Sequence, residues 1–220
     1  MNNIVMQKPK SRILSDRLTA REALSGGVRR ENSARGAVFL DRDGTLNVER
    51  GYILQPADIE LIPTAGESVR TLNDLNIPVI IITNQAAIDK NLLSPEQLER
   101  VNEKLWTELS AAGAYYDALY YCPHSPEVTP ECQCRKPKPG LILQAARDFN
   151  IDLSASFMIG DKPSDIGAGR SAGCKTILLL SHGGQDAHQG AEAASNASPD
   201  LTCRNVGEAI AWLLPRIQSG

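Results

Sequence analysis

Short apolar segments alternate with segments whose apolar residues recur at helical spacing over most of this chain. The apolar segments predict strands at residues 37–41, 77–83, 118–122, 156–160 and 175–180. The amphipathic segments predict helices at residues 67–75, 94–112, 140–150, 164–172 and 206–217. Strands that are apolar throughout and alternate with helices are typical of a parallel sheet covered on both faces. The sequence therefore predicts an α/β fold of three layers, a doubly wound parallel sheet between helices.

Residues 1–35 do not share this pattern. They are polar, and they contain one short helical pattern at residues 15–24. A polar segment with little apolar surface to bury does not form a packed core. We therefore predict a flexible N-terminal extension over residues 1–35 and one domain over residues 36–220, with a proline- and cysteine-rich loop at 122–134.

Polar side chains follow the predicted strands at their carboxyl ends. Asp41 and Asp43 end the first strand, Thr83 ends the second and Asp161 follows the fourth. Because ligands of such sheets bind beyond these ends, we expect the side chains to meet there. Converging carboxylates repel one another unless a cation shares the site, and their oxygens suit Mg²⁺. With a phosphate bound there, Asp41 would attack phosphorus and Asp43 would protonate the leaving oxygen; the alternative is a plain loop with Asp and Gly as turn formers.

A second group of residues lies in the proline-rich loop. Cys122, His124, Cys132 and Cys134 place three of the five cysteines and one of the three histidines close together. Three thiolates and one imidazole suit tetrahedral Zn²⁺, and four protein ligands leave no open position, so we predict a structural zinc site. The alternatives are a redox pair at Cys132 and Cys134, or free inert thiols.

Two cations directly follow the last of these cysteines. Zinc bound at Cys134 would fix Arg135 and Lys136 over the edge of the sheet. Lys136 would then offset charge on a transferred phosphoryl group, and Arg135 would hold a phosphate or sugar oxygen through two hydrogen bonds. The alternative is a basic turn that only adds solubility.

Composition and charge narrow the class of protein. The chain has 220 residues, with 23 Lys and Arg against 26 Asp and Glu, and 42% of its residues are hydrophobic. No apolar run reaches the roughly 18–20 residues of a membrane span, and residues 1–30 lack the pattern of a secretory signal. The near-neutral charge disfavours a protein that coats nucleic acid. We expect a cytoplasmic protein that keeps its cysteines reduced.

The motifs occur in the order found in one phosphatase family. They are Asp41-Arg-Asp-Gly-Thr-Leu-Asn47, Gly51-Tyr52, Thr83-Asn-Gln85, Cys122-Pro-His124, Cys132-Gln-Cys-Arg-Lys-Pro137 and Gly160-Asp-Lys162. Over residues 38–180 the chain resembles the haloacid dehalogenase (HAD)-type phosphatases, and within them the heptose-bisphosphate and histidinol-phosphate phosphatase group. The resemblance implies a HAD-like Rossmannoid sheet without a large cap domain.

The resemblance also implies roles for the site residues. Asp41 would be the nucleophile that becomes an aspartyl-phosphate, and Asp43 the general acid and later the base. Mg²⁺ would be held by Asp41, the backbone carbonyl of Asp43, and Asp161, while Thr83 and Lys136 would stabilise the phosphoryl group. The cysteine and histidine cluster would hold structural zinc. The implied substrate-binding residues are Tyr52, Asn84, Gln85, Arg135 and Lys162.

The chain departs from the family pattern after Thr83-Asn-Gln85. Where the family often continues with Ser-Gly, Ile and an Arg-Gly pair, this chain has Ala86-Ala87-Ile88-Asp89-Lys90-Asn91. A hydroxyl and an arginine near the substrate are missing, and Asp89 would repel a phosphate if it faced the site. These changes bear on the choice of substrate, because the residues that carry the chemistry are intact.

The resemblance implies Mg²⁺-dependent removal of the 7-phosphate of D-glycero-D-manno-heptose 1,7-bisphosphate, on the route to nucleotide-activated heptose. Hydrolysis of histidinol phosphate or of another small sugar phosphate is the nearest alternative. From other classes, a zinc-knuckle module that binds nucleic acid and an inactive regulatory relative also remain. We expect a small phosphorylated sugar as the partner, no nucleic acid or membrane, and a monomer.

Overall fold

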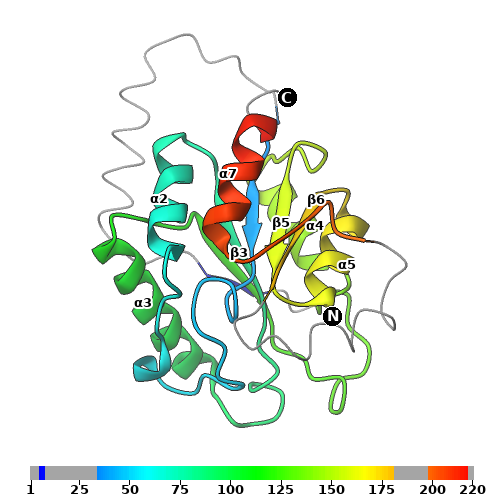
Figure 1. Cartoon of the computed structure of the whole chain (residues 1–220). Helices are drawn as coiled ribbons and strands as arrows, with labels where there is room; N and C mark the ends of the chain where they lie inside the picture. Colours follow the sequence, from blue (N-terminus) through cyan, green and yellow to red (C-terminus); the bar gives the residue numbers. More distant parts are fainter. Residues whose placement is uncertain (1–4, 8–33, 181–197, 218–220) are drawn as a thin grey trace.

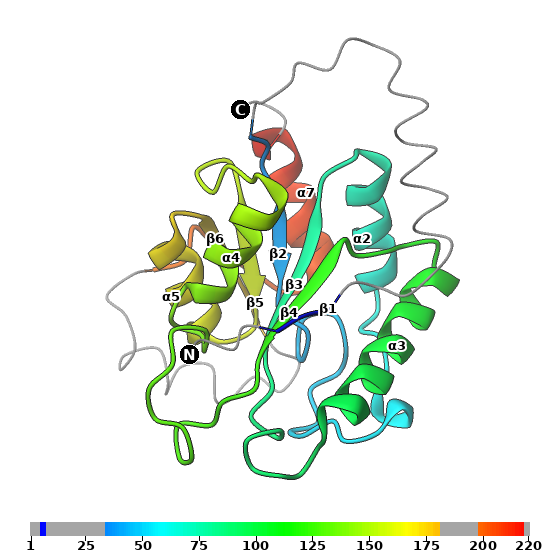
Figure 2. The same ribbon diagram turned by 180° about the vertical axis from the view of Figure 1, so that it is seen from behind.

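The computed structural model describes residues 5–7, 34–180 and 198–217, which form one sheet with helices on both faces (Figures 1 and 2). The strand order is β1-β4-β3-β2-β5-β6-β7, and every pair is parallel except β1 with β4. The strands are β1 Val5–Gln7, β2 Val38–Leu40, β3 Val79–Asn84, β4 Ala118–Cys122, β5 Phe157–Gly160, β6 Lys175–Leu179 and β7 Leu201–Cys203. The helices are α2 Ala65–Asp74, α3 Pro95–Ala111, α4 Gly140–Phe149, α5 Pro163–Ala172 and α7 Val206–Ile217, with a short 3₁₀ helix, η1, at Pro56–Asp58.

Alternate residues of the central strands pack into two separate apolar cores. On β2, Val38 and Leu40 belong to the core that also contains the apolar residues of α2, α3 and α7. Phe39, between them, belongs to the core under α4 and α5. Side chains alternate between the faces of a strand, so a strand that is apolar at every position must be covered on both sides. Figures 1 and 2 show α2, α3 and α7 on one face and α4 and α5 on the other.

The helix boundaries follow from local sequence. At the start of α3, the Ser94 hydroxyl accepts a hydrogen bond from the Gln97 backbone N–H, and the Gln97 side-chain oxygen accepts one from the Ser94 N–H. This reciprocal arrangement satisfies two amides that have no partner within the helix, and Pro95 at the first position has no N–H to satisfy. Leu98, Val101 and Leu105 then form the buried face of α3.

The order of the strands places a change of winding direction beside β2. From β2 the chain proceeds to β3 and β4 on one side, and it then crosses back to form β5, β6 and β7 on the other. Leu40, near the end of β2, pairs with Ile81 of β3 and Ile159 of β5. The loops after β2, β3 and β4 lie together at one end of the sheet (Figures 1 and 2). In open α/β sheets, ligands bind at this edge, next to the change of direction.

The predicted fold class, with no cap-sized insertion among the described residues, is confirmed, and so are the five predicted strands and five predicted helices. Two strands were not predicted. β7 has only three residues, and β1 lies inside the segment expected to be a flexible extension, where residues 5–7 instead pair antiparallel with β4. The helical pattern at residues 15–24 lies outside the described residues, and the division into an extension and one domain stays a prediction. Among the described helices, none is long and apolar enough to cross a membrane.

Candidate active site

Three buried or half-buried carboxylates meet beyond the ends of β2 and β5. Asp41 follows β2, Asp161 follows β5, and Asp165 lies in the first turn of α5. One oxygen from each lies within 4.8 Å of the others. Asp41 and Asp161 were predicted to converge here, whereas Asp165 was not singled out from the sequence.

Lys136 lies within this cluster and is almost completely buried. Its Nζ is 2.7 Å from Asp41 Oδ1 and 2.6 Å from Asp165 Oδ1, and it donates to the backbone carbonyl of Ile82 at 2.8 Å. Its backbone is held as well, because the side chain of Asn84 accepts from the Lys136 N–H and donates to the Lys136 carbonyl. Lys136 is therefore fixed at both ends, and its charge faces the carboxylates as predicted.

Two glycines allow these carboxylates to approach the backbone. Gly44, in the turn after β2, has φ of 86°, and a Cβ at this position would lie 2.1 Å from Asp161 Oδ2. Gly160, the last residue of β5, would place a Cβ 2.2 Å from Asp165 Oδ2. No side chain fits at either position without displacing a carboxylate.

The electrostatics of the cluster are those of crowded like charges. Burial, offset in part by Lys136 and reinforced by the neighbouring carboxylates, raises the pKa of Asp41 to about 7. Burial likewise raises the pKa of Asp161 to about 6, against the opposing effect of the Lys162 charge. Burial alone would lower the pKa of Lys136, but Asp165 and Asp41 raise it. The site holds more negative charge than one lysine neutralises.

The donor set fits a hard divalent cation. Asp161 Oδ1 is buried and has no hydrogen-bond partner, which is costly for a carboxylate oxygen. The Asp161 carboxylate belongs to the same cluster as those of Asp41 and Asp165. Carboxylate oxygens at this spacing are ligands that Mg²⁺ accepts, so an ion here would satisfy the orphaned oxygen and reduce the repulsion.

Asp43 occupies a separate cradle next to the cluster. Arg42, which is completely buried, donates from Nε to Asp43 Oδ1 at 3.0 Å and from Nη2 to Oδ2 at 2.9 Å. Asn47 and Gln85 donate to the same carboxylate at 2.9 and 3.0 Å. Burial alone would raise the pKa of Asp43, but the charge and hydrogen bonds of Arg42, with those of Asn47 and Gln85, lower it. Its carboxylate is thus held ionised and in one orientation, and Asn102 of α3 holds the third guanidinium nitrogen of Arg42.

The end of β3 contributes Thr83, which is 1% exposed. Its hydroxyl accepts a hydrogen bond from Gln85 Nε2 at 2.8 Å, the same nitrogen that donates to Asp43. Gln85 therefore links Thr83 to Asp43, and Asn84 links β3 to Lys136. These two predicted substrate-binding residues connect parts of the site to one another in the structure.

The remaining predicted substrate-binding residues lie in the surrounding loops. The side chain of Arg135 donates from Nη1 to the His124 carbonyl at 3.0 Å. Lys162, which is half exposed, forms an ion pair with Glu49. Tyr52 is 46% exposed, and the Lys90 ammonium lies 5.8 Å from the centre of its ring.

The cysteines and histidine of the proline-rich loop form a second cluster. Cys122 Sγ lies 3.2 Å from Cys134 Sγ and 3.8 Å from Cys132 Sγ, while His124 Nδ1 lies 3.2 Å from Cys134 Sγ. Ligands about 2.0–2.3 Å from a tetrahedral zinc ion are separated by roughly 3.5–3.8 Å. The two separations of 3.2 Å are shorter than this and the third lies at its upper end, so the four side chains are close enough together to share one zinc ion. Hydrogen bonding from Cys122, against burial, lowers the pKa of Cys134 to about 5. All five cysteines of the chain lie in the described part, and none forms a disulfide.

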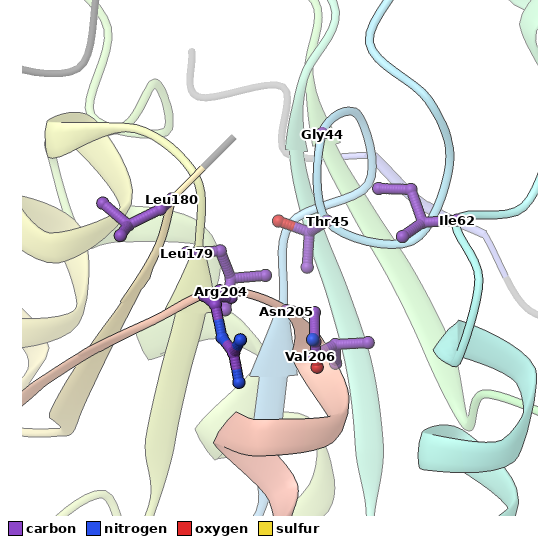
Figure 3. Close-up of a pocket in the computed structure, with 8 residues that line it drawn as sticks. All are labelled: Gly44, Thr45, Ile62, Leu179, Leu180, Arg204, Asn205 and Val206. Carbon is purple, nitrogen blue, oxygen red and sulfur yellow. The ribbon is translucent and has the colours of Figure 1, made fainter. Parts of the chain in front are cut away.

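A small cavity lies beside the Gly44–Thr45 turn, where β6 and β7 end and α7 begins (Figure 3). Its volume of about 10 Å³ is room for one water molecule. It is lined by Gly44, Thr45, Ile62, Leu179, Leu180, Arg204, Asn205 and Val206. It is too small for a sugar phosphate, and its walls include none of the three clustered carboxylates.

Asp165 and Arg42 are among the contributors to the site that sequence reasoning missed. Asp165 lies four residues after Asp161, and its Oδ2 accepts the Lys162 N–H at 3.0 Å at the start of α5. An acidic residue in a first helical turn reads as a cap, so its second role was visible only through the fold. Arg42 stands between two predicted site residues, and nothing in its position along the chain predicts a fully buried guanidinium.

Comparison with known proteins agrees with this geometry. A family model described as HAD-hydrolase-like matches residues 133–209. The D-glycero-β-D-manno-heptose-1,7-bisphosphate 7-phosphatase of Haemophilus ducreyi is 41% identical over 152 residues, which cover 67% of this chain and 84% of that protein. The enzyme of the same name from Helicobacter pylori is 38% identical over 178 residues, covering 80% and 96% of the two chains.

A solved structure supports the same assignment. The D,D-heptose 1,7-bisphosphate phosphatase of B. bronchiseptica, complexed with magnesium and phosphate, superposes with a TM-score of 0.73 and 27% identity, covering 82% of this chain and 98% of that one. This chain is a phosphatase, and it belongs to the D-glycero-β-D-manno-heptose-1,7-bisphosphate 7-phosphatase family of HAD-like hydrolases.

Proposed function

We propose that this phosphatase removes the 7-phosphate of D-glycero-D-manno-heptose 1,7-bisphosphate, with Mg²⁺ at the carboxylate cluster, in the synthesis of nucleotide-activated heptose. The observation that carries the chemistry is the convergence of Asp41, Asp161 and Asp165 around Lys136. The names of relatives that match most of this chain support the substrate. The cytoplasm as its location, the monomeric state and the lack of nucleic-acid or membrane partners stay predictions.

In the proposed mechanism, a carboxylate oxygen of Asp41 attacks phosphorus, and the bond from phosphorus to the sugar oxygen breaks. Asp43 gives its proton to the leaving oxygen; it then takes a proton from the water that attacks the aspartyl-phosphate, so that phosphate is released and Asp41 is restored. The structure holds Asp43 ionised, so its acid role needs a proton taken up when the phosphate dianion binds beside it, which like charge favours.

Lys136 and Thr83 would stabilise the charge on the phosphoryl oxygens during the transfer, in a site that is largely shielded from water. Asp41, Asp161, Asp165 and the backbone carbonyl of Asp43 would hold Mg²⁺, which would supply positive charge to offset that of the carboxylates and the phosphoryl group. Asp165 holds Lys136 as well, so it would serve both the metal and the lysine.

We further propose that the cysteine cluster holds one structural zinc ion. Its four ligands would occupy every position of a tetrahedral ion, which leaves none for substrate. The metal would order a loop that has few apolar residues. It would also fix Cys134, and with it the position of Arg135 and Lys136, which follow directly in the chain.

A substrate panel tests the proposed activity. Phosphate release is measured with heptose 1,7-bisphosphate, histidinol phosphate and several other small sugar phosphates, with Mg²⁺ present. We expect the highest kcat/KM for the heptose bisphosphate, and we expect Asp41→Asn, which keeps the side-chain volume, to lose at least about a thousandfold in kcat. Higher kcat/KM for histidinol phosphate would overturn the substrate, and an active Asp41→Asn enzyme would overturn the mechanism.

A further inference from the structure

The segment after β3, at residues 85–91, is hydrogen-bonded to the tip of the zinc loop, which we define as residues 123–131. Asp89 Oδ2 accepts the backbone N–H of Ser125 at 2.8 Å, and the Asp89 N–H donates to the Pro123 carbonyl at 3.3 Å. The same carboxylate accepts hydrogen bonds from Thr129, and with Ser125 these lower the pKa of Asp89. The Asp89 carboxylate is therefore held by hydrogen bonds to the loop.

The Asp89 side chain is hydrogen-bonded to a compact turn at residues 125–129. The Thr129 N–H donates to the Ser125 carbonyl at 2.7 Å, and the Val128 N–H donates to it at 3.1 Å. Ser125 itself is completely buried. Without Asp89, the Ser125 N–H would be a buried donor with no partner. Because such a donor is costly, we expect the turn to move until the N–H finds water or another acceptor.

A second contact joins the same two segments. Lys90 Nζ lies 2.8 Å from Glu127 Oε2, and its side chain is 24% exposed while that of Glu127 is 75% exposed. An ion pair with one such exposed partner contributes little to stability. The connection between the segments therefore depends mainly on Asp89.

The turn lies next to a residue predicted to bind substrate. Ser125 follows His124, whose carbonyl accepts the Arg135 guanidinium at 3.0 Å. Movement of the turn would therefore move the acceptor that orients Arg135. Lys136 does not depend on this path, because Asp41, Asp165, Ile82 and Asn84 hold it independently.

We propose that Asp89 is a positioning residue, which fixes the tip of the zinc loop through Ser125 and thereby orients Arg135 toward the part of the substrate that lies away from the transferred phosphate. This inference rests on the proposed function. Asp89 should therefore affect substrate affinity. Phosphoryl transfer should not depend on Asp89, because other residues hold Lys136.

The experiment compares Asp89→Ala with Asp89→Asn, because asparagine keeps a carbonyl oxygen that can accept the Ser125 N–H. Glu131→Ala is the control, since it removes an exposed carboxylate from the same loop. We expect Asp89→Ala to raise KM for heptose 1,7-bisphosphate about tenfold with kcat within about twofold, and Asp89→Asn and Glu131→Ala to stay close to the wild type. With p-nitrophenyl phosphate, which lacks the distal part of the substrate, all variants should match the wild type, and each should retain its zinc.

Hydrogen exchange of the peptide spanning residues 123–131 supplies a readout independent of activity. We expect faster exchange in Asp89→Ala and wild-type exchange in Asp89→Asn. Unchanged exchange in Asp89→Ala, equal effects of both Asp89 variants, or an equal loss of kcat with p-nitrophenyl phosphate would each overturn the proposal. If the wild type prefers another phosphate, the proposed function fails, whereas exchange and KM measured with the preferred phosphate still decide the role of Asp89.

Discussion

The carboxylates of Asp41, Asp161 and Asp165 are brought together by close approach to the backbone at two glycines. Gly44 combines a left-handed φ of 86° with a Cβ position that Asp161 already occupies, so two independent constraints exclude any other residue. The first constraint is on the backbone conformation of Gly44 itself, and the second is the steric clash between its Cβ and the Asp161 carboxylate. Alanine substitutions at Gly44 and at a second glycine with positive φ but no close neighbour distinguish the two constraints.

We expect Gly44→Ala to weaken Mg²⁺ binding at least tenfold and to lower kcat/KM about a hundredfold, since the methyl group would displace the Asp161 carboxylate. Gly173→Ala is the matched control, because Gly173 has φ of 94° with nothing within 4 Å of a Cβ. The control should lose about 1–2 kcal/mol of stability through backbone strain and keep its Mg²⁺ affinity. Isothermal titration with Mg²⁺ and steady-state kinetics measure both, and equal Mg²⁺ affinity in the two variants would contradict the steric explanation.

At the scale of single elements, the zinc loop differs most from the rest of the fold. The central strands and helices bury apolar side chains in the two cores, whereas the loop at residues 122–134 has its buried residues at the cysteine cluster and Ser125. A segment ordered by four ligands loses its order when one ligand is removed. Its effect on catalysis follows from where it ends, directly before the two cations.

We therefore predict that Cys134→Ser loses zinc and lowers kcat/KM at least tenfold, because Arg135, which directly follows the lost ligand, loses its fixed position. Cys203→Ser is the control, since Cys203 lies at the end of β7, outside the cluster, and its thiol donates to the Asn205 carbonyl as a hydroxyl also would. Metal analysis of the purified variants gives the zinc content, and phosphate release gives the rate. A Cys134→Ser enzyme with a full complement of zinc and wild-type kinetics would refute the proposed role of the loop.

On the scale of the whole molecule, the active site joins the two halves of the sheet. Asp41 follows β2, whereas Asp161 follows β5 and Asp165 lies in the first turn of α5, on the side of the sheet that forms after the chain has crossed back. Their mutual repulsion therefore acts across the middle of the fold. A cation that binds them should stabilise the entire domain, because binding to the folded state alone shifts the unfolding equilibrium.

Saturating Mg²⁺, at about a hundred times its Kd, is predicted to add about 2.7 kcal/mol and to raise the melting temperature of the zinc-loaded protein by roughly 5–10 °C. Without Mg²⁺, Asp161→Asn should melt at a higher temperature than the wild type, because one repelling charge is gone, and Mg²⁺ should then have little effect on it. Thermal denaturation in MgCl₂, with NaCl at matched ionic strength as the control, measures both. An equal rise in the wild type and in Asp161→Asn would place the Mg²⁺ effect elsewhere.

The sequence by itself was enough to predict the layers, the central strands, the long helices and most of the residues that form the two clusters. The physical reason is that these features are local: an apolar run, a helical period, a cap such as Ser94, or cysteines close together along the chain are each visible within a few residues. Ends of parallel strands share one edge, so residues such as Asp41, Thr83 and Asp161 could be expected to meet even though they are far apart in sequence.

Only the tertiary structure decided what depends on contacts between distant segments. It paired residues 5–7 and 201–203 with the edges of the sheet, although neither segment lies in an apolar run of more than three residues, too short a pattern to predict a strand. It also placed the buried guanidinium of Arg42 against Asp43, the carboxylate of Asp165 against Lys136, and that of Asp89 against Ser125. A charged side chain carries no sign of its partner along the chain, because the partner is set by the packing of separate elements and by the cost of leaving a buried charge unpaired.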